Sequence, residues 1–232
     1  MNLRVLCLNP GSTSTKLAVY KDDAEEAAST LQHPASVLAS FVSVASQEPM
    51  RQKVLEDFLA QHAEAGFDAV VGRGGLLRPL QSGVYRVNDA MCDDLTRARW
   101  GEHASNLGAL LARAMGERYG CPAFVADPVV VDELDPLARI SGHPALPRRS
   151  IFHALNQKSA AREACGRRGL DYDKARLIVA HMGGGCSVGA HRDGRVVAVN
   201  NALDGEGPFS PERVGTLPAG QLVDLACSGR MS

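Results

Sequence analysis

The sequence predicts an α/β protein built from two related lobes. Two distant segments, residues 3–20 and 177–190, share one design: an apolar strand, a turn rich in glycine or serine, and a second apolar strand. Between them, runs with helical periodicity alternate with short apolar runs that are typical of buried strands. The chain has 232 residues and is 45% hydrophobic, so it is long enough to fill two cores.

Charge and composition exclude several classes of function. The net charge is −1, with acidic and basic residues interspersed, so no large field favours nucleic acid or an anionic membrane. No apolar run approaches the roughly 20 residues of a membrane span, and we expect a cytoplasmic protein. The six cysteines lack the C-x-x-C spacing of a zinc site, and we interpret them as reduced: Cys7, Cys92, Cys121, Cys165, Cys186 and Cys227.

The first turn, Asn9–Lys16, has the chemistry of a phosphate cradle. Gly11 allows a tight bend, and hydroxyls, an amide and an ammonium group lie beside exposed backbone N–H groups. The groups expected to face phosphate oxygens are Asn9, Ser12, Ser14 and Lys16. A Ser/Thr-rich turn that hydrogen-bonds to itself is the alternative. The spacing is not that of a Walker loop, because a strand follows where a helix should.

The second turn contains three consecutive glycines, Gly183, Gly184 and Gly185. With no side chains above the backbone, a bulky anion can approach its N–H groups. Two turns of similar design suggest that the lobes hold one phosphate chain between them, although two unrelated hairpins remain an alternative. Asp193-Gly194 then predicts another hairpin, into a strand at 195–199.

Further elements of the first lobe follow from periodicity. We expect a turn or short helix at 22–28, a helix at 49–66 and a buried strand at 67–71, whereas 37–44 cannot be placed. The predicted strand leads into Arg73, framed by glycines and able to grip a carboxylate with its two-pronged guanidinium. A solvated loop arginine is the alternative.

Two more candidate residues lie at the ends of elements. Asn88 is predicted to cap a helix after the strand at 83–87, and residues 101–106 open another helix, where His103 sits near N–H groups that favour anions. A strand at 122–126 delivers Asp127 to its carboxyl end, where ligands bind in open α/β sheets. For both His103 and Asp127, an ordinary polar side chain without a role in binding is the alternative.

Residues 135–149 are rich in proline and basic residues, so the predicted domains are 1–149 and 150–232. In the second, we expect a helix at 151–166 with three inward-facing residues, a short helical stretch beginning at Pro211, and a last helix at 218–228. The inward-facing residues are Phe152, Leu155 and Ala161.

Taken together, the motifs resemble the butyrate kinases of the acetokinase family, within the acetate and sugar kinase, actin and heat-shock chaperone superfamily. The strings that carry the resemblance, in order, are NPGSTSTK, GRGGLL, YRVN, GEHASNLG, DPVVVDEL, RISG, SIFHALNQK, AHMGGGCSVGAH and NNALDGEGPFSPERVGTLP. The resemblance implies a two-lobed actin/acetate-kinase-like (ribonuclease H-like) fold. It also implies reversible phosphoryl transfer between ATP and a short-chain carboxylate with Mg²⁺, giving an acyl phosphate and ADP, in a dimer or larger homo-oligomer.

The resemblance also assigns roles to residues. It places Asn9, Ser12, Ser14 and Lys16 in a first phosphate loop and Gly183, Gly184 and Gly185 in a second. Arg73 corresponds to the arginine that grips the carboxylate or acyl phosphate, and His103 and His181 to histidines near the transferring phosphoryl group. Asp127, with Asn9, is implied in metal positioning. Such an alignment of positive and N–H groups suits phosphoryl transfer, and the attacking carboxylate needs no base because it is already ionised at pH 7.

Two departures qualify the resemblance. Acetate kinases place an arginine after glycine and threonine, where this chain has Gly215-Thr216-Leu217; Arg213 is a possible substitute. The sequence also corresponds to about two thirds of the family's length and lacks its later adenosine loop, so we expect an incomplete second lobe. A non-catalytic binder of carboxylate, phosphate or a partner chain therefore stays an alternative, as do acetate, propionate and isobutyrate kinases.

Overall fold

The computed structural model describes residues 2–60 and 66–229. The chain folds into two compact units, Met1–Val130 and Val131–Ser232. The division lies before the proline-rich stretch, because residues that follow Val130 pack against the second unit; the buried Glu133 carboxylate, for example, pairs with Lys158. The lobe boundary at 149/150 stays a prediction.

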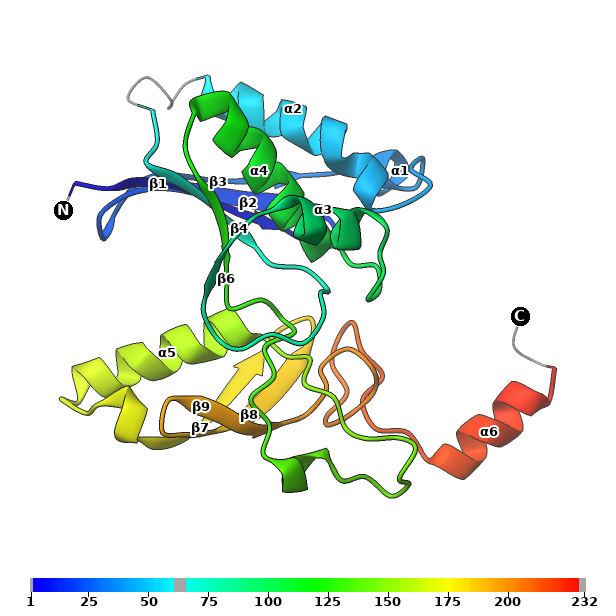
Figure 1. The fold of residues 1–232 in the computed structure, drawn as a ribbon. Helices are drawn as coiled ribbons and strands as arrows, with labels where there is room; N and C mark the ends of the chain where they lie inside the picture. Colours follow the sequence, from blue (N-terminus) through cyan, green and yellow to red (C-terminus); the bar gives the residue numbers. More distant parts are fainter. Residues whose placement is uncertain (1, 61–65, 230–232) are drawn as a thin grey trace. The chain divides into compact units, whose positions relative to one another are not determined.

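The first unit is built on a six-stranded sheet with the order β3-β2-β1-β4-β6-β5 (Figure 1). The three central strands β1, β4 and β6 are parallel, and the outer strands pair antiparallel. The strands are β1 Arg4–Pro10, β2 Ser14–Lys21, β3 Ala24–Gln32, β4 Ala69–Arg73, β5 Val84–Arg86 and β6 Ala123–Ala126. β1 and β2 form the predicted hairpin, in which Asn9 lies opposite Lys16.

The helices of this unit are α1 Ala35–Leu38, α2 Glu48–Leu59, α3 Asp89–Thr96 and α4 Leu107–Tyr119. α2 and α4 pack together over one face of the sheet (Figure 1), and apolar residues from β1, β2, α2 and α4 form the main core. The Asn88 side chain caps α3 by accepting the Met91 N–H, as predicted. α4 ends at Gly120, whose φ of 66° suits glycine.

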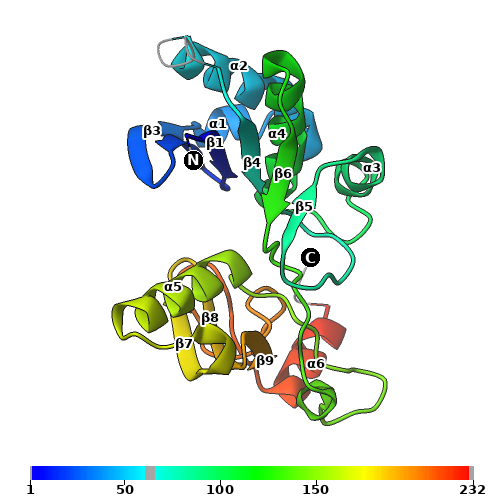
Figure 2. The same ribbon diagram turned by 60° about the vertical axis from the view of Figure 1, so that its left-hand side comes forward.

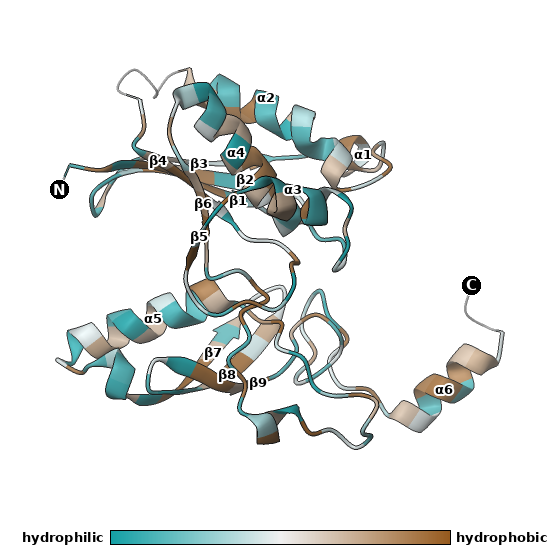
Figure 3. Ribbon diagram, viewed as in Figure 1, coloured by the Kyte–Doolittle hydropathy of each residue, from teal (hydrophilic) through white to brown (hydrophobic). Residues whose placement is uncertain are grey.

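The second unit has a three-stranded antiparallel sheet, β7-β8-β9, with α5 packed on β7 (Figure 2). Its elements are α5 Ala154–Arg167, β7 Arg176–Met182, β8 Cys186–Arg192, β9 Arg195–Val199 and α6 Ala219–Cys227. α6 is largely hydrophobic (Figure 3), yet none of its residues is buried. Among the described residues, no helix combines the length and apolar character needed to cross a bilayer.

Several predicted elements differ from the structure. Residues 22–28 lie mostly in β3, because pairing with β2 overrides the weak strand propensity of an alanine- and glutamate-rich segment. The stretch after Pro211 forms a turn closed by a bridge between Ser210 and Arg213, not a helix. Leu155, expected to face inward, is 42% exposed. The predicted helix at 49–66 is described as Glu48–Leu59, and its residues 61–65 lie outside the described part of the chain.

Candidate functional site

Three of the predicted site residues meet at one edge of the first sheet. Asn9 lies near the end of β1, Arg73 ends β4, and Asp127 directly follows β6. The parallel register pairs Leu8 with Gly72 and Arg73 with Ala126, so the carboxyl ends of β1, β4 and β6 lie next to one another at the same edge of the sheet. Such an edge is where open α/β sheets bind ligands.

The Arg73 side chain is positioned to present a cation at this edge. Its Nη1 donates to Asn9 Oδ1 at 3.4 Å, and burial lowers the pKa of the guanidinium from its usual value. Since an arginine stays protonated even when its pKa falls, burial here strengthens its attraction for an anion. Asn9 thus helps to orient the Arg73 side chain.

The Asp127 carboxylate is held by the two residues that precede β5. Its Oδ1 accepts from Ser82 Oγ at 2.6 Å and from the Gly83 N–H at 2.8 Å. Its backbone has a φ of +37°, which aspartate tolerates better than most residues, and only 7% of the residue is exposed. Ser82 gave no sequence signal, because it reaches Asp127 only through the fold.

The first glycine turn lies above a buried cation. The Gly11 N–H donates to Ser14 O at 2.7 Å and closes the turn. Beneath it, Arg51 Nη1 donates to Ser14 O at 3.2 Å and to Thr15 Oγ1 at 3.0 Å. Arg51 is 1% exposed, and burial lowers its pKa. Ser12 and Lys16 are exposed, so two of the predicted phosphate contacts face solvent.

His103 begins the segment that packs against the loop after β4. Its Nδ1 accepts the Ser105 N–H at 3.2 Å, which leaves Nε2 as the protonated nitrogen of the neutral ring. The Asn106 side chain accepts the Leu76 N–H at 2.9 Å and donates to Gly101 O at 3.0 Å. This buried amide fastens the His103 segment to the loop after Arg73.

The close approach of α4 to β4 depends on two glycines. A Cβ atom on Gly72 would overlap the carbonyl oxygen of Gly108, and a Cβ atom on Gly108 would overlap the carbonyl oxygen of Arg73. Larger residues at either position would push the helix from the strand that ends in Arg73.

In the second unit, each glycine of the triple-glycine turn faces a different polar side chain. A Cβ atom at Gly183 would lie 3.3 Å from His181 Nε2, and one at Gly185 would lie 3.4 Å from His153 Cε1. One at Gly184 would lie 2.7 Å from the carboxylate carbon of Glu212. Of these three side chains only His181 was predicted, whereas His153 and Glu212 reach the turn from distant parts of the sequence.

The two histidines are stacked and supported by hydrogen bonds. Their ring centroids are 3.7 Å apart and their planes differ by 10°. His181 Nδ1 bonds with Asn156 Oδ1 at 2.7 Å, and His153 Nδ1 bonds with Ser187 Oγ at 2.9 Å. Gln157 Nε2 donates to the same hydroxyl at 2.8 Å.

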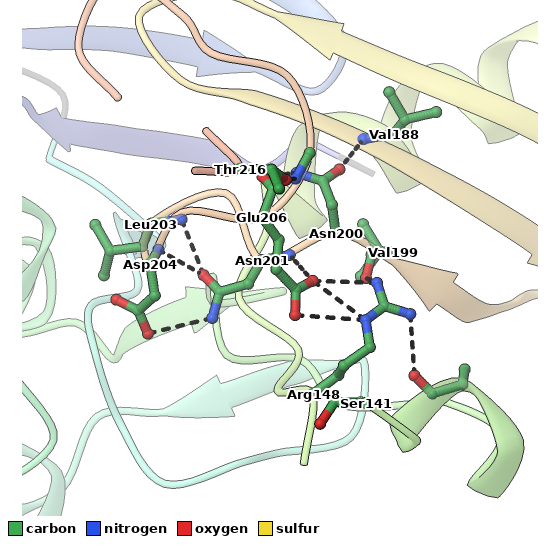
Figure 4. Close-up of polar contacts among 12 residues, drawn as sticks. Ser141, Arg148, Val188, Val199, Asn200, Asn201, Leu203, Asp204, Glu206 and Thr216 are labelled. Atoms are coloured by element: carbon green, nitrogen blue, oxygen red, sulfur yellow. Dashed lines mark hydrogen bonds and ion pairs between the residues drawn. The ribbon is translucent and has the colours of Figure 1, made fainter. Parts of the chain in front are cut away.

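The loop that carries Glu212 is joined to the turn by two hydrogen bonds to one carbonyl oxygen. Ser210 Oγ and the Glu212 N–H both donate to Gly184 O, at 2.6 and 3.0 Å. Farther along the loop, Asn200 accepts the Val188 N–H and Arg148 pairs with Glu206 (Figure 4). The Glu212 carboxylate is therefore part of an ordered surface above the glycines.

Known proteins are similar to this chain over almost its whole length. No protein-family model matches the chain. A probable butyrate kinase of Coprothermobacter proteolyticus is 55% identical over 227 residues, which cover 97% of this chain and 64% of the relative. Butyrate kinase 2 of Clostridium acetobutylicum is 50% identical over 236 residues, covering 99% of this chain and 65% of the relative. The chain is a homologue of the butyrate kinases. It spans just under two thirds of the length of these curated relatives.

Solved structures support the fold. Acetate kinase of Porphyromonas gingivalis superimposes with a TM-score of 0.74 at 19% identity, over 99% of this chain and 65% of the acetate kinase chain. A propionate kinase of Francisella tularensis gives a TM-score of 0.70 at 17% identity, with the same coverage. At these identities the match establishes the α/β acetate-kinase fold, of which the chain contains one lobe and part of a second.

Proposed function

We propose that the protein is a carboxylate kinase that transfers a phosphoryl group reversibly between ATP and butyrate or a related short-chain fatty acid. The observation that carries the proposal is the arrangement of Asn9, Arg73 and Asp127 at three adjacent strand ends, in a chain 55% identical to a probable butyrate kinase and 50% identical to butyrate kinase 2. The arrangement of the three residues is suited to binding an anion, and the similarity to butyrate kinases supplies the class of reaction.

In this proposal, each unit contributes its own set of groups. Arg73 holds the substrate carboxylate through its two-pronged guanidinium, and His103 presents an N–H at Nε2. Asn9, Ser12, Ser14 and Lys16 contact phosphate oxygens in the first unit. His181 and the backbone of Gly183, Gly184 and Gly185 do so in the second. Positive and N–H groups of this kind stabilise a phosphoryl group whose charge is spread over three oxygens.

The residues fit Mg²⁺ only as an ion that arrives with nucleotide phosphates. Among the described residues, no group of three or more His, Cys, Asp or Glu side chains could hold a metal ion. Asp127 has one carboxylate oxygen engaged by Ser82 and Gly83, and it could supply a ligand together with Asn9. Mg²⁺ is commonly held by one or two carboxylates plus substrate phosphates, and it would neutralise phosphate charge there.

Acyl phosphate formation from ATP, Mg²⁺ and butyrate, trapped as the hydroxamate, tests the proposal. We expect Arg73→Ala to lower the rate by a factor on the order of 100 or more, because a charged contact to the reacting group is lost. Arg78→Ala is the matched control, since Arg78 is 63% exposed and pairs with Asp94. Equal rates in the two variants would contradict the role of Arg73.

Comparison of carboxylates in the same assay ranks butyrate against acetate, propionate and isobutyrate, which differ by only about 1–3 kcal/mol per methylene in an apolar pocket. Binding of ADP by a folded sample that forms no acyl phosphate would favour the alternative function, a non-catalytic binder.

We also propose that the protein is cytoplasmic and forms a homo-oligomer. Light scattering of the purified chain tests the oligomeric state.

A further inference from the structure

Arg51 of α2 is a buried cation whose hydrogen-bond partners are neutral. Its Nη1 donates to Ser14 O at 3.2 Å and to Thr15 Oγ1 at 3.0 Å, and its Nε and Nη2 donate to Gln47 Oε1 at 3.2 and 2.9 Å. Only 1% of the residue is exposed, and burial lowers its pKa, with no carboxylate of residues 2–60 or 66–229 acting in the opposite direction. Since an arginine stays protonated in proteins, a positive charge lies beneath the first turn without a counterion among these residues.

A buried charge of this kind is costly, and two other buried charges of the chain have partners. Lys158, which is 1% exposed, pairs with Glu133 at 2.8 Å, and the buried Asp94 carboxylate contacts Arg78 and Arg99. Pairing with an opposite charge is what usually makes burial tolerable. A ligand with negative charge at the first turn would supply the counterion that Arg51 lacks.

The acceptors that Arg51 contacts at the turn each have a second partner. Ser14 O also accepts the Gly11 N–H at 2.7 Å, and Thr15 Oγ1 also bonds with His33 Nε2 at 2.8 Å. Loss of the guanidinium would therefore leave neither oxygen without a hydrogen bond. Support of the turn does not by itself account for a charged group at this position.

We propose that Arg51 is a positioning residue of the first turn, which holds Ser14 from the protein interior and whose uncompensated positive charge favours a phosphate group on the solvent side of the turn. The proposal rests on the proposed function, which supplies the phosphate ligand and assigns a contact to Ser14 but no role to Arg51. The guanidinium acts without touching the ligand. Its charge is effective over this distance because water does not screen a buried group as it screens an exposed one.

Gln47→Glu separates this role from a purely structural one, because it adds a charge and keeps the shape of the side chain. The carboxylate would accept from Arg51 Nε and Nη2 as the Gln47 amide oxygen does, so the contacts of Arg51 with Ser14 and Thr15 remain. We expect the free protein to melt at a higher temperature, because the buried cation gains a counterion. Phosphate binding should weaken on the order of tenfold, because the same counterion cancels the attraction. A role limited to holding the turn predicts unchanged or tighter binding.

Arg51→Met removes the charge and keeps most of the length of the side chain. It should also weaken phosphate binding on the order of tenfold. Lys53→Met is the matched control, because it removes a cation from the same helix, but one whose side chain is 76% exposed and pairs with Asp57. We expect the control to bind phosphate within about twofold of the wild type, since water and salt screen an exposed ammonium group.

Calorimetry of the full chain at low ionic strength measures the binding of inorganic phosphate and of ATP, and circular dichroism verifies that each variant folds. The amide NMR signals of Gly11 and Ser14 should shift as phosphate is added to the wild type. If Arg51→Met does not fold, Gln47→Glu decides the question. Wild-type affinity in Gln47→Glu, equal weakening in Lys53→Met, or unshifted signals of both amides would overturn the role of Arg51 while leaving the proposed function intact. A folded wild type that binds neither ATP nor phosphate would overturn both.

Discussion

The second unit should lose stability in mild acid because of His191. The residue is 2% exposed and bonds with Tyr172 and Gln157. Burial, with a further contribution from the Lys158 ammonium, lowers the pKa of His191 from 6.5 to about 4; the nearby Glu133 acts in the opposite direction, and Arg162 adds to the lowering. The folded protein thus keeps this ring neutral at a pH where an unfolded chain would protonate it.

The size of the effect follows from the two pKa values. Between pH 6.5 and 4 the unfolded state binds more protons than the folded state, so the free energy of unfolding falls as pH falls. The contribution of His191 is nearly constant above pH 7. It decreases by about 2 kcal/mol from pH 7 to pH 5, and by about 3 kcal/mol at pH 4, where the folded ring begins to protonate.

Urea unfolding at pH 7, 6 and 5, followed by resolved amide NMR signals of β8 and β9, measures this unit directly. His191→Gln cannot be protonated and is the control, because other groups that titrate contribute equally to both proteins. We expect the stability of the wild type to fall more steeply with acid than that of the variant, by about 2 kcal/mol over this range. Parallel curves for the two proteins would refute the reasoning, as would an NMR titration of His191 with a midpoint near 6.5.

Three further predictions concern buried or crowded positions. Lys158→Met should destabilise the second unit by about 3–5 kcal/mol in urea, because it leaves the Glu133 carboxylate buried without a cation, and adding Glu133→Leu should restore most of the loss. Gly108→Ala should cost about 1–3 kcal/mol in thermal unfolding, because its Cβ would overlap the carbonyl oxygen at the end of β4, whereas Gly166→Ala, in open space on α5, should cost nothing. Glu212→Gln should tighten ADP binding severalfold in calorimetry, because it removes the anion above the triple-glycine turn. An unchanged stability of Lys158→Met would contradict the role of the buried ion pair, and unchanged ADP binding by Glu212→Gln would contradict the role of that carboxylate. Equal effects of the two alanine substitutions would contradict the close contact at Gly108.

Local signals in the sequence were sufficient for elements whose structure depends on local interactions. The hairpin that carries the first turn and the cap at Asn88 each depend on residues close in sequence, and the structure contains both. β3 has no such signal. Its alanines and glutamates form a strand only because β2 lies beside them, and that pairing is a tertiary contact.

The candidate site divides in the same way. Arg73 and Asp127 could be predicted because each follows a recognisable strand, and parallel strands bring their ends to one edge. Ser82 and Arg51 could not, since Ser82 reaches Asp127 across 45 positions and Arg51 reaches Thr15 across 36. Their roles depend on which segments the fold brings together, and nothing in the spacing of the sequence encodes that.

The two glycine turns obtain their polar groups by different means. The first turn carries its own hydroxyls and packs on Arg51, a buried cation that belongs to α2 and not to the turn. The second turn has three glycines and no side chains of its own, so apart from its backbone N–H groups, its polar groups must come from elsewhere. His153, which directly precedes α5, stacks on His181 beside this turn, and its Nδ1 bonds with Ser187 Oγ. The second turn therefore depends on side chains that the fold brings to it, whereas the first carries polar side chains in its own sequence.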